Sequence, residues 1–262
     1  MSDNGIVYTV FTKPWKMPTP ELGKHIKALG FDGIELPVRP GYQVEPEDVA
    51  KGLPECARQL ADFGIKIYSV AGPSDEATIA ACAEAGVPII RVMARVGDEG
   101  YMATEAATQK EYDELVPLLD KHGVQLGVQN HCDKFVGSAI GLLHLIERYD
   151  PKHVAAVWDA AHCALDGEPP ELAVDILWSH LCMVNLKNAI WRRSTGPEAE
   201  VVQWRHYWTS GRQGLASWPK VAEELKNRDF EGIVCLTAEY SDEEAVDRLI
   251  AEDIAFAKSL FA

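Results

Sequence analysis

The sequence predicts an α/β protein that folds as one closed (β/α)8 barrel over residues 1–262. Three observations favour this fold: eight short apolar segments alternate with eight helical segments, the chain has 262 residues, and no glycine-rich nucleotide-binding turn occurs. Strict alternation implies parallel strands joined by helical crossovers. An open, doubly wound sheet is the alternative, but a count of eight strands in a chain of roughly 250 residues favours the barrel.

The predicted strands are short apolar runs without a clean polar alternation, which is typical of parallel strands buried on both faces. They lie at residues 6–11, 31–36, 65–70, 88–93, 124–130, 153–159, 181–187 and 232–240.

The predicted helices have recognisable ends. The first has Thr19 as its N-cap, Pro20 in its first turn and Gly30 after its end, and Ser74 is the expected N-cap of the third. Helices are predicted at residues 19–29, 46–62, 74–85, 104–121, 138–148, 170–179 and 242–259, with one more after residue 214.

One segment interrupts this alternation. Residues 188–214 separate the seventh strand from its helix and are rich in Trp, Arg and small residues. A loop this long in a compact domain is usually functional or mobile. In a barrel it emerges at the carboxyl ends of the strands, where active sites lie. We expect it either to cover a substrate or to contact a second copy of the chain in a homo-oligomer.

Composition excludes several classes of partner. With 25 Lys and Arg against 40 Asp and Glu, the net charge of −15 argues against a nucleic acid or an anionic membrane surface. No apolar run is long enough to span a membrane, and the start of the chain lacks the basic region of a signal peptide. The six cysteines form no C-x-x-C pair, so we expect reduced core residues and a cytoplasmic protein.

Polar residues stand at or near the carboxyl ends of six predicted strands. They are Glu35, Arg91, Arg95, Gln129, Asn130, His131, Asp159, His162, Asn185, Lys187, Asn188, Glu239 and Tyr240. The carboxylates and amides of strands five to eight would converge at the mouth of a barrel. Such an oxygen-rich cluster is of the kind that hard divalent cations accept.

Five segments carry a family resemblance. FDGIEL, GVQLGVQNH, VWDAAH, VNLKNA and the closing segment GRQGLASWPKVAEELKNRDFEGIVCLTAEY each match a strand motif in order. Over nearly its whole length the chain resembles the xylose isomerase-like TIM barrels, in particular the sugar phosphate isomerase/epimerase group.

The resemblance implies a divalent metal, Mg2+ or Mn2+, held at Gln129, Asp159, Asn185 and Glu239. Two of these positions depart from the family pattern, because Gln129 replaces a glutamate and Asn185 replaces a histidine. The formal charge of the carboxylate ligands falls from −3 to −2. Amide oxygens still ligate Mg2+, Mn2+ or Ca2+, whereas Zn2+ loses its imidazole ligand.

The resemblance also suggests catalytic residues. Gln129 cannot exchange a proton near neutral pH, so a one-base reaction beside a carbonyl is expected, with Glu239 as the base and His162 contacting a substrate hydroxyl. Substrate contacts are expected from Glu35, Arg95, His131, Lys187, Trp191, Arg192 and His206.

These residues predict an isomerase or epimerase of a small sugar, keto-sugar or polyol. Two alternatives stay open: a dehydratase or lyase that uses the same proton abstraction, and a sugar-binding barrel that has lost catalysis with its metal ligands. An abasic-site endonuclease shares the fold, but the net charge of −15 and the missing histidines oppose it.

Overall fold

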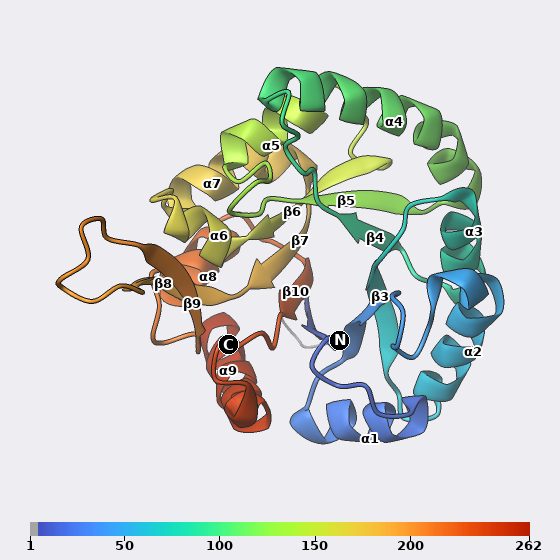
Figure 1. Ribbon diagram of the computed structural model, residues 1–262. Helices are drawn as coiled ribbons and strands as arrows, with labels where there is room; N and C mark the ends of the chain where they lie inside the picture. Colours follow the sequence, from blue (N-terminus) through green and yellow to red (C-terminus); the bar gives the residue numbers. More distant parts are fainter. Residues whose placement is uncertain (1–4) are drawn as a thin grey trace.

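The computed structural model describes residues 5–262, so residues 1–4 of the predicted domain lie outside it. Eight parallel strands close into a barrel in the order β1-β10-β7-β6-β5-β4-β3-β2, and the helices surround it (Figure 1). The strands are β1 (Ile6–Phe11), β2 (Gly33–Pro37), β3 (Lys66–Ala71), β4 (Ile89–Val92), β5 (Gln125–Gln129), β6 (Val154–Asp159), β7 (Leu181–Leu186) and β10 (Gly232–Leu236). The predicted (β/α)8 fold is confirmed.

Nine α-helices accompany these strands within residues 5–262. They are α1 (Thr19–Leu29), α2 (Val49–Ala61), α3 (Glu76–Ala85), α4 (Tyr101–His122), α5 (Ala139–Ile146), α6 (Ala160–Leu165), α7 (Pro170–Leu177), α8 (Trp218–Lys226) and α9 (Val246–Phe261). Short 3-10 turns span Pro46–Asp48, Trp178–His180 and Glu243–Ala245. No helix in this part of the chain combines the length and apolar character needed to cross a membrane.

Apolar side chains pack in two layers. The larger layer fills the space between strands and helices. The smaller one fills the barrel interior and includes Phe11, Ile89, Val157 and Met183. Gly127 on β5 faces this interior, where an added Cβ would come within 2.7 Å of Val157. A larger residue at 127 would therefore disturb the packing beneath the mouth of the barrel.

Several helix starts differ from the sequence prediction. The N-cap of α1 is Pro18 rather than Thr19, which is the first helical residue, and α4 begins at Tyr101 rather than at residue 104.

The helices beside β3 and β6 also differ. α3 begins after Asp75 rather than Ser74, because the Asp75 side chain accepts the backbone N–H of Thr78. The short helix α6 was not predicted at all. It begins directly after strand β6, and Asp159 caps it through its carboxylate. The cap thus places α6 against the carboxyl end of β6.

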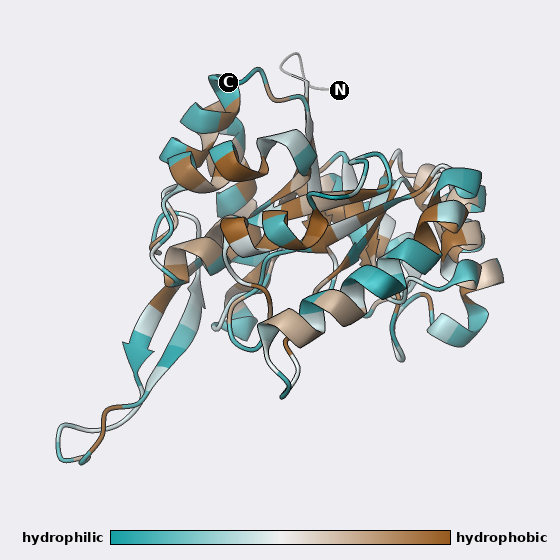
Figure 2. Ribbon diagram, turned by 90° about the horizontal axis from the view of Figure 1, so that it is seen from above, coloured by the Kyte–Doolittle hydropathy of each residue, from teal (hydrophilic) through white to brown (hydrophobic). Residues whose placement is uncertain are grey.

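The segment predicted as a long loop is largely a β-hairpin. β8 (Asn188–Arg193) pairs antiparallel with β9 (Trp204–Thr209), with Asn188 opposite Thr209. Aromatic residues, which favour strands, are concentrated in the second arm. The hairpin tip extends away from the helices of the barrel (Figure 2).

Candidate active site

A pocket of about 120 Å³ lies at the carboxyl ends of the barrel strands. Its lining residues come from the ends of every barrel strand except β3, or from the chain that follows those ends. They are Phe11, Lys13, Arg39, Arg91, Met93, Gln129, His131, His162, Asn185, Lys187, Thr237 and Glu239. Two larger open cavities adjoin it, one sharing Arg39 and Arg91 and the other sharing Lys13 and Glu239. The site therefore has room for a ligand that extends beyond the central pocket.

A chain of buried polar side chains crosses the floor of this pocket. The Nε of Arg91 donates to Oε1 of Glu35 at 2.7 Å, and the Nη1 of Arg91 donates to Oε1 of Gln129. The Nε2 of Gln129 in turn donates to Oδ2 of Asp159 at 2.9 Å. Each of the four side chains is buried. The Gln129 amide thus accepts a hydrogen bond from the Arg91 guanidinium and donates one to the Asp159 carboxylate.

Asp159 is held from two directions. Its Oδ1 accepts the backbone N–H groups of Ala161 and His162, at 3.0 and 3.3 Å, at the start of α6. Its Oδ2 accepts Gln129. Burial raises the pKa of Asp159 to about 6, even though the ammonium of Lys187 acts in the opposite direction. Asp159 is completely buried and does not line the pocket.

Glu239 lies between two ammonium groups. Its Oε1 accepts Lys13 at 2.5 Å, and its Oε2 accepts Lys187 at 2.8 Å. Burial opposes ionisation of Glu239, but Lys187 and Lys13 outweigh it and lower the pKa to about 2. The Lys187 ammonium also lies 3.7 Å from the ring centre of Trp208. Glu239 is therefore a permanent anion and a weak base at neutral pH.

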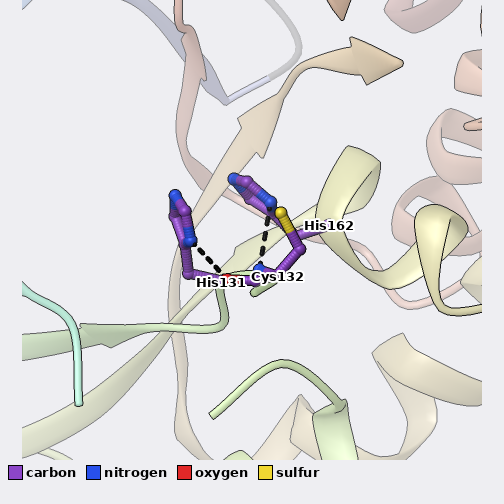
Figure 3. A group of neighbouring side chains, drawn as sticks. All are labelled: His131, Cys132 and His162. Carbon is purple, nitrogen blue, oxygen red and sulfur yellow. Dashed lines mark hydrogen bonds between the residues drawn. The ribbon is translucent and has the colours of Figure 1, made fainter. Parts of the chain in front are cut away.

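Two histidines at the mouth of the barrel form hydrogen bonds with the main chain of Cys132 (Figure 3). The Nδ1 of His131 lies 2.9 Å from the Cys132 carbonyl oxygen, and the Cys132 N–H donates to Nδ1 of His162 at 3.2 Å. The two ring centres are 4.0 Å apart. Burial lowers the pKa of both imidazoles, and that of His162 falls well below its usual value. Both rings are thus neutral near pH 7.

Two polar atoms of the lining residues lack a hydrogen-bond partner. They are Nε2 of His162 and Oδ1 of Asn185, and both are buried. The Nε2 of His162 is 3.7 Å from Oδ2 of Asp159, which is too long for a hydrogen bond. Buried polar atoms are nearly always satisfied, so atoms left open beside a pocket suggest that a polar ligand completes them.

The four residues expected to hold a divalent metal do not fit one. The Gln129 oxygen already accepts Arg91, and its nitrogen faces Asp159. Glu239 is neutralised by two lysines. Around the site the carboxylates of Glu35, Asp159 and Glu239 are matched by the cations of Lys13, Arg91 and Lys187. A divalent ion placed among these groups would face three fixed positive charges.

Other side chains lie close enough together to hold a metal ion. Within residues 5–262 these are His131, Cys132 and His162, and a second group of Cys132, Asp133 and His206. Burial raises the pKa of the Cys132 thiol to about 12. Because metals bind the thiolate, this high pKa opposes ligation at neutral pH.

The structure separates the predicted substrate residues into three groups. His131 and Lys187 line the pocket. Glu35 lies beneath it as the partner of Arg91, and Arg95 lines the adjoining cavity.

The remaining three, Trp191, Arg192 and His206, belong to the hairpin and do not line the pocket. Trp191 donates to the Leu165 carbonyl, and Arg192 stacks on Tyr207. The hairpin instead presents Trp208, whose ring packs beside His162 with centres 5.3 Å apart.

The sequence analysis did not assign Lys13 or Arg39 to the site, and it named Arg91 only as a polar residue near a strand end, without a role. Lys13 follows β1 by two residues, which is the same strand-end signal that identified Glu239. Arg91 is a charged residue inside the apolar segment PIIRVM, and its burial required a partner. Both signals were present in the sequence.

The barrel belongs to a known family. Residues 24–260 match the family described as the xylose isomerase-like TIM barrel, so the chain belongs to that family. A search of curated proteins found no match.

Several solved structures share the fold at low sequence identity. D-psicose 3-epimerase from Clostridium cellulolyticum H10 shares 13% identity with a TM-score of 0.72, covering 97% of this chain and 99% of the other. The probable 3-DHS dehydratase AsbF from Bacillus anthracis shares 13% identity with a TM-score of 0.72, covering 96% and 98%. The 3-keto-D-glucoside 4-epimerase YcjR from E. coli shares 14% identity with a TM-score of 0.71, covering 97% and 99%. At these identities the likeness concerns the fold.

Proposed function

We propose that the protein is an isomerase or epimerase of a small sugar, keto-sugar or polyol, and that it removes a proton beside a carbonyl group. One observation carries the proposal: a single pocket combines a lysine ammonium, two neutral imidazoles and two buried polar atoms that have no hydrogen-bond partner. Enolate chemistry needs a base for the carbon-bound proton and a positive group for the oxygen that gains charge. Membership of a family whose structural neighbours include sugar epimerases supports the same assignment.

In this mechanism the cation is supplied by the chain itself. Lys187 is held beside the pocket by Glu239 and Trp208. Its ammonium, together with the Nε2–H of His162, is suited to a carbonyl oxygen that becomes an enolate. Fixed donors in a buried site need little reorganisation as the charge develops. Because the predicted metal ligands do not fit a divalent ion, no step is assigned to a metal.

A dehydratase is the second candidate. The same proton removal beside a carbonyl leads to loss of water when a hydroxyl stands on the β carbon. The structural likeness to the probable 3-DHS dehydratase AsbF favours this alternative. The two reactions differ in product, since only elimination forms a carbon–carbon double bond that persists.

The test is solvent exchange. The purified protein is incubated in D2O with a panel of ketoses, aldoses and keto-polyols, and deuterium at carbon and product structure are followed by NMR. We expect incorporation beside the carbonyl of at least one compound. Lys187→Met is expected to lower the exchange rate by about 10²–10³-fold, the usual effect of losing one such donor.

Arg58→Ala is the matched control, because Arg58 is a surface cation paired only with Glu55 on α2. It is expected to exchange at the wild-type rate. If the panel bound, as judged by thermal shift, without any exchange, the protein would be a sugar-binding barrel and the proposed activity would be excluded.

A further inference from the structure

We propose that His131 is the general base of this site and that the main chain of Cys132 fixes it in the required tautomer. The inference rests on the proposed function and deepens it by naming the group that takes the proton. It follows from two hydrogen bonds and from the placement of the ring in the pocket.

The two bonds leave no choice of tautomer. A carbonyl oxygen only accepts, so the Nδ1 of His131 that contacts the Cys132 carbonyl carries a proton. An amide N–H only donates, so the Nδ1 of His162 that receives it carries a lone pair. In a neutral imidazole the other nitrogen has the opposite character. His131 therefore presents a lone pair at Nε2, and His162 presents a proton at Nε2.

The surroundings of His131 suit a base. Its ring lines the pocket and packs against the rings of His162 and Phe135, with ring centres 4.0 and 4.8 Å away. The main-chain hydrogen bond occupies Nδ1, which leaves Nε2 as the ring nitrogen that can meet a substrate.

The two carboxylates of the site are weaker candidates. Glu239 is paired with two ammonium groups, so each of its oxygens is already engaged. Asp159 does not line the pocket, and both of its oxygens accept hydrogen bonds. The sequence-based prediction of Glu239 as the base stays untested, and the geometry favours His131.

The proton transfer balances as follows. Nε2 of His131 takes the proton from the carbon beside the carbonyl, and the electron pair of that C–H bond forms the carbon–carbon double bond of the enolate. The carbonyl oxygen gains the negative charge beside Lys187 and the Nε2–H of His162. An isomerisation is completed when the hydroxyl proton of the carbon that was deprotonated passes to the enolate oxygen and the proton on Nε2 returns to the former carbonyl carbon, so that the carbonyl group has moved by one carbon. In a dehydration the β-hydroxyl instead takes the proton from Nε2 and leaves as water, while the enolate oxygen becomes a carbonyl again.

The first arm of the test needs no substrate. In protein labelled with ¹⁵N-histidine, chemical shifts distinguish protonated from unprotonated ring nitrogens, and the signals are assigned with His131→Gln and His162→Gln. We expect a proton on Nδ1 of His131 and on Nε2 of His162. Cys132→Ser, which keeps the main chain but removes the thiol, is expected to retain both tautomers. The opposite tautomer at His131 would overturn the proposal.

The second arm measures exchange with a compound that the wild-type protein deuterates. We expect His131→Gln to lower the rate by about 10²–10⁴-fold with thermal-shift binding retained. His122→Gln is the matched control, since His122 ends α4 at the opposite end of the barrel.

The outcomes separate the two proposals. Exchange at the wild-type rate in His131→Gln would overturn the base assignment while leaving the proposed activity intact. If the wild-type protein deuterates no compound of the panel, the proposed activity fails, whatever tautomer is found.

Discussion

Two carboxylates at the mouth of the barrel have pKa values that are shifted in opposite directions. Burial raises the pKa of Asp159 to about 6, whereas Lys187 and Lys13 overcome the effect of burial and lower that of Glu239 to about 2. The difference arises from partners: Asp159 accepts mainly uncharged N–H groups, and Glu239 accepts two ammonium groups. Two acidic residues that look alike in sequence therefore differ in the pH at which they ionise and in their contribution to stability.

Glu239→Gln tests how much this carboxylate stabilises the fold. The pKa of Glu239 is about 2 in the folded chain and 4.5 in the unfolded chain. The stabilisation is therefore complete above pH 4.5 and is lost as the pH falls through about 2. We expect the variant to lose about 3 kcal/mol of unfolding free energy at pH 7 and about half of that at pH 3. Urea unfolding at both pH values measures it, and an equal loss at both would contradict the assigned pKa.

Gln129→Glu tests whether the amide at position 129 prevents a divalent metal ion from binding. The variant places a second carboxylate against Oδ2 of Asp159, where the wild type has an amide donor. We expect Mn2+ to stabilise the variant by about 1–3 kcal/mol near saturation and to leave the wild type unchanged. Thermal unfolding with Mn2+ and with a chelator measures both. Equal stabilisation of the wild type would show that the native site accepts the ion.

At the scale of elements, the hairpin contributes to the site through its base. Trp208 lies near the end of β9 and packs on Lys187 and His162, whereas Trp204 lies at the start of β9 and is 58% exposed. The pocket therefore depends on the arm of β9 that returns to the barrel. The expected homo-oligomer contact through this segment stays a prediction.

Trp208→Ala is expected to slow deuterium exchange about tenfold, because the lost ring contact is worth roughly 0.5–2 kcal/mol to Lys187. Trp204→Ala is the matched control and should exchange like the wild type. A comparable loss in both variants would mean that the hairpin acts as a whole rather than through Trp208.

Helix α9 is hydrogen-bonded to the chain that follows the hairpin. Both oxygens of Asp253 accept the backbone N–H of Gly211, at 2.9 and 3.0 Å, and Oδ2 also accepts the Tyr240 hydroxyl at 2.8 Å. Burial raises the pKa of Asp253 to about 6, so the carboxylate is ionised at pH 7. It thus joins α9, the end of the hairpin and the segment after β10.

Asp253→Asn replaces one accepting oxygen with a donor. We expect it to lower the unfolding free energy by about 1–3 kcal/mol, the cost of a buried unsatisfied group. Glu252→Gln, one residue earlier on the same helix and exposed, should change it by less than about 0.5 kcal/mol. Urea denaturation compares the two, and equal effects would argue against the anchoring role.

For the whole molecule, the barrel could be predicted because its signal is local and repeated. Each apolar segment and each helix end lies within a few residues, and eight repeats leave few alternatives. The residues at strand ends followed from the same rule, which placed His131, Lys187 and Glu239 around one pocket.

The pairing of these residues could not be predicted in the same way. Lys13 and Glu239 are 226 positions apart, and Arg91 reaches Glu35 across 56 positions. Such pairs depend on barrel closure and register rather than on any local pattern. For the same reason the sequence could not show that cations surround the supposed metal ligands.

The balance of three carboxylates and three cations at the mouth has a consequence for the charge of the ligand. Arg39 lines the same pocket, and no carboxylate of residues 5–262 forms an ion pair with it. Electroneutrality thus leaves room for a single negative charge. We expect a sugar acid to bind more tightly than the neutral sugar of the same size, and a doubly charged phosphate ester to gain little more. Calorimetric titration of the three compounds at two salt concentrations measures this preference, and Arg39→Gln should abolish it.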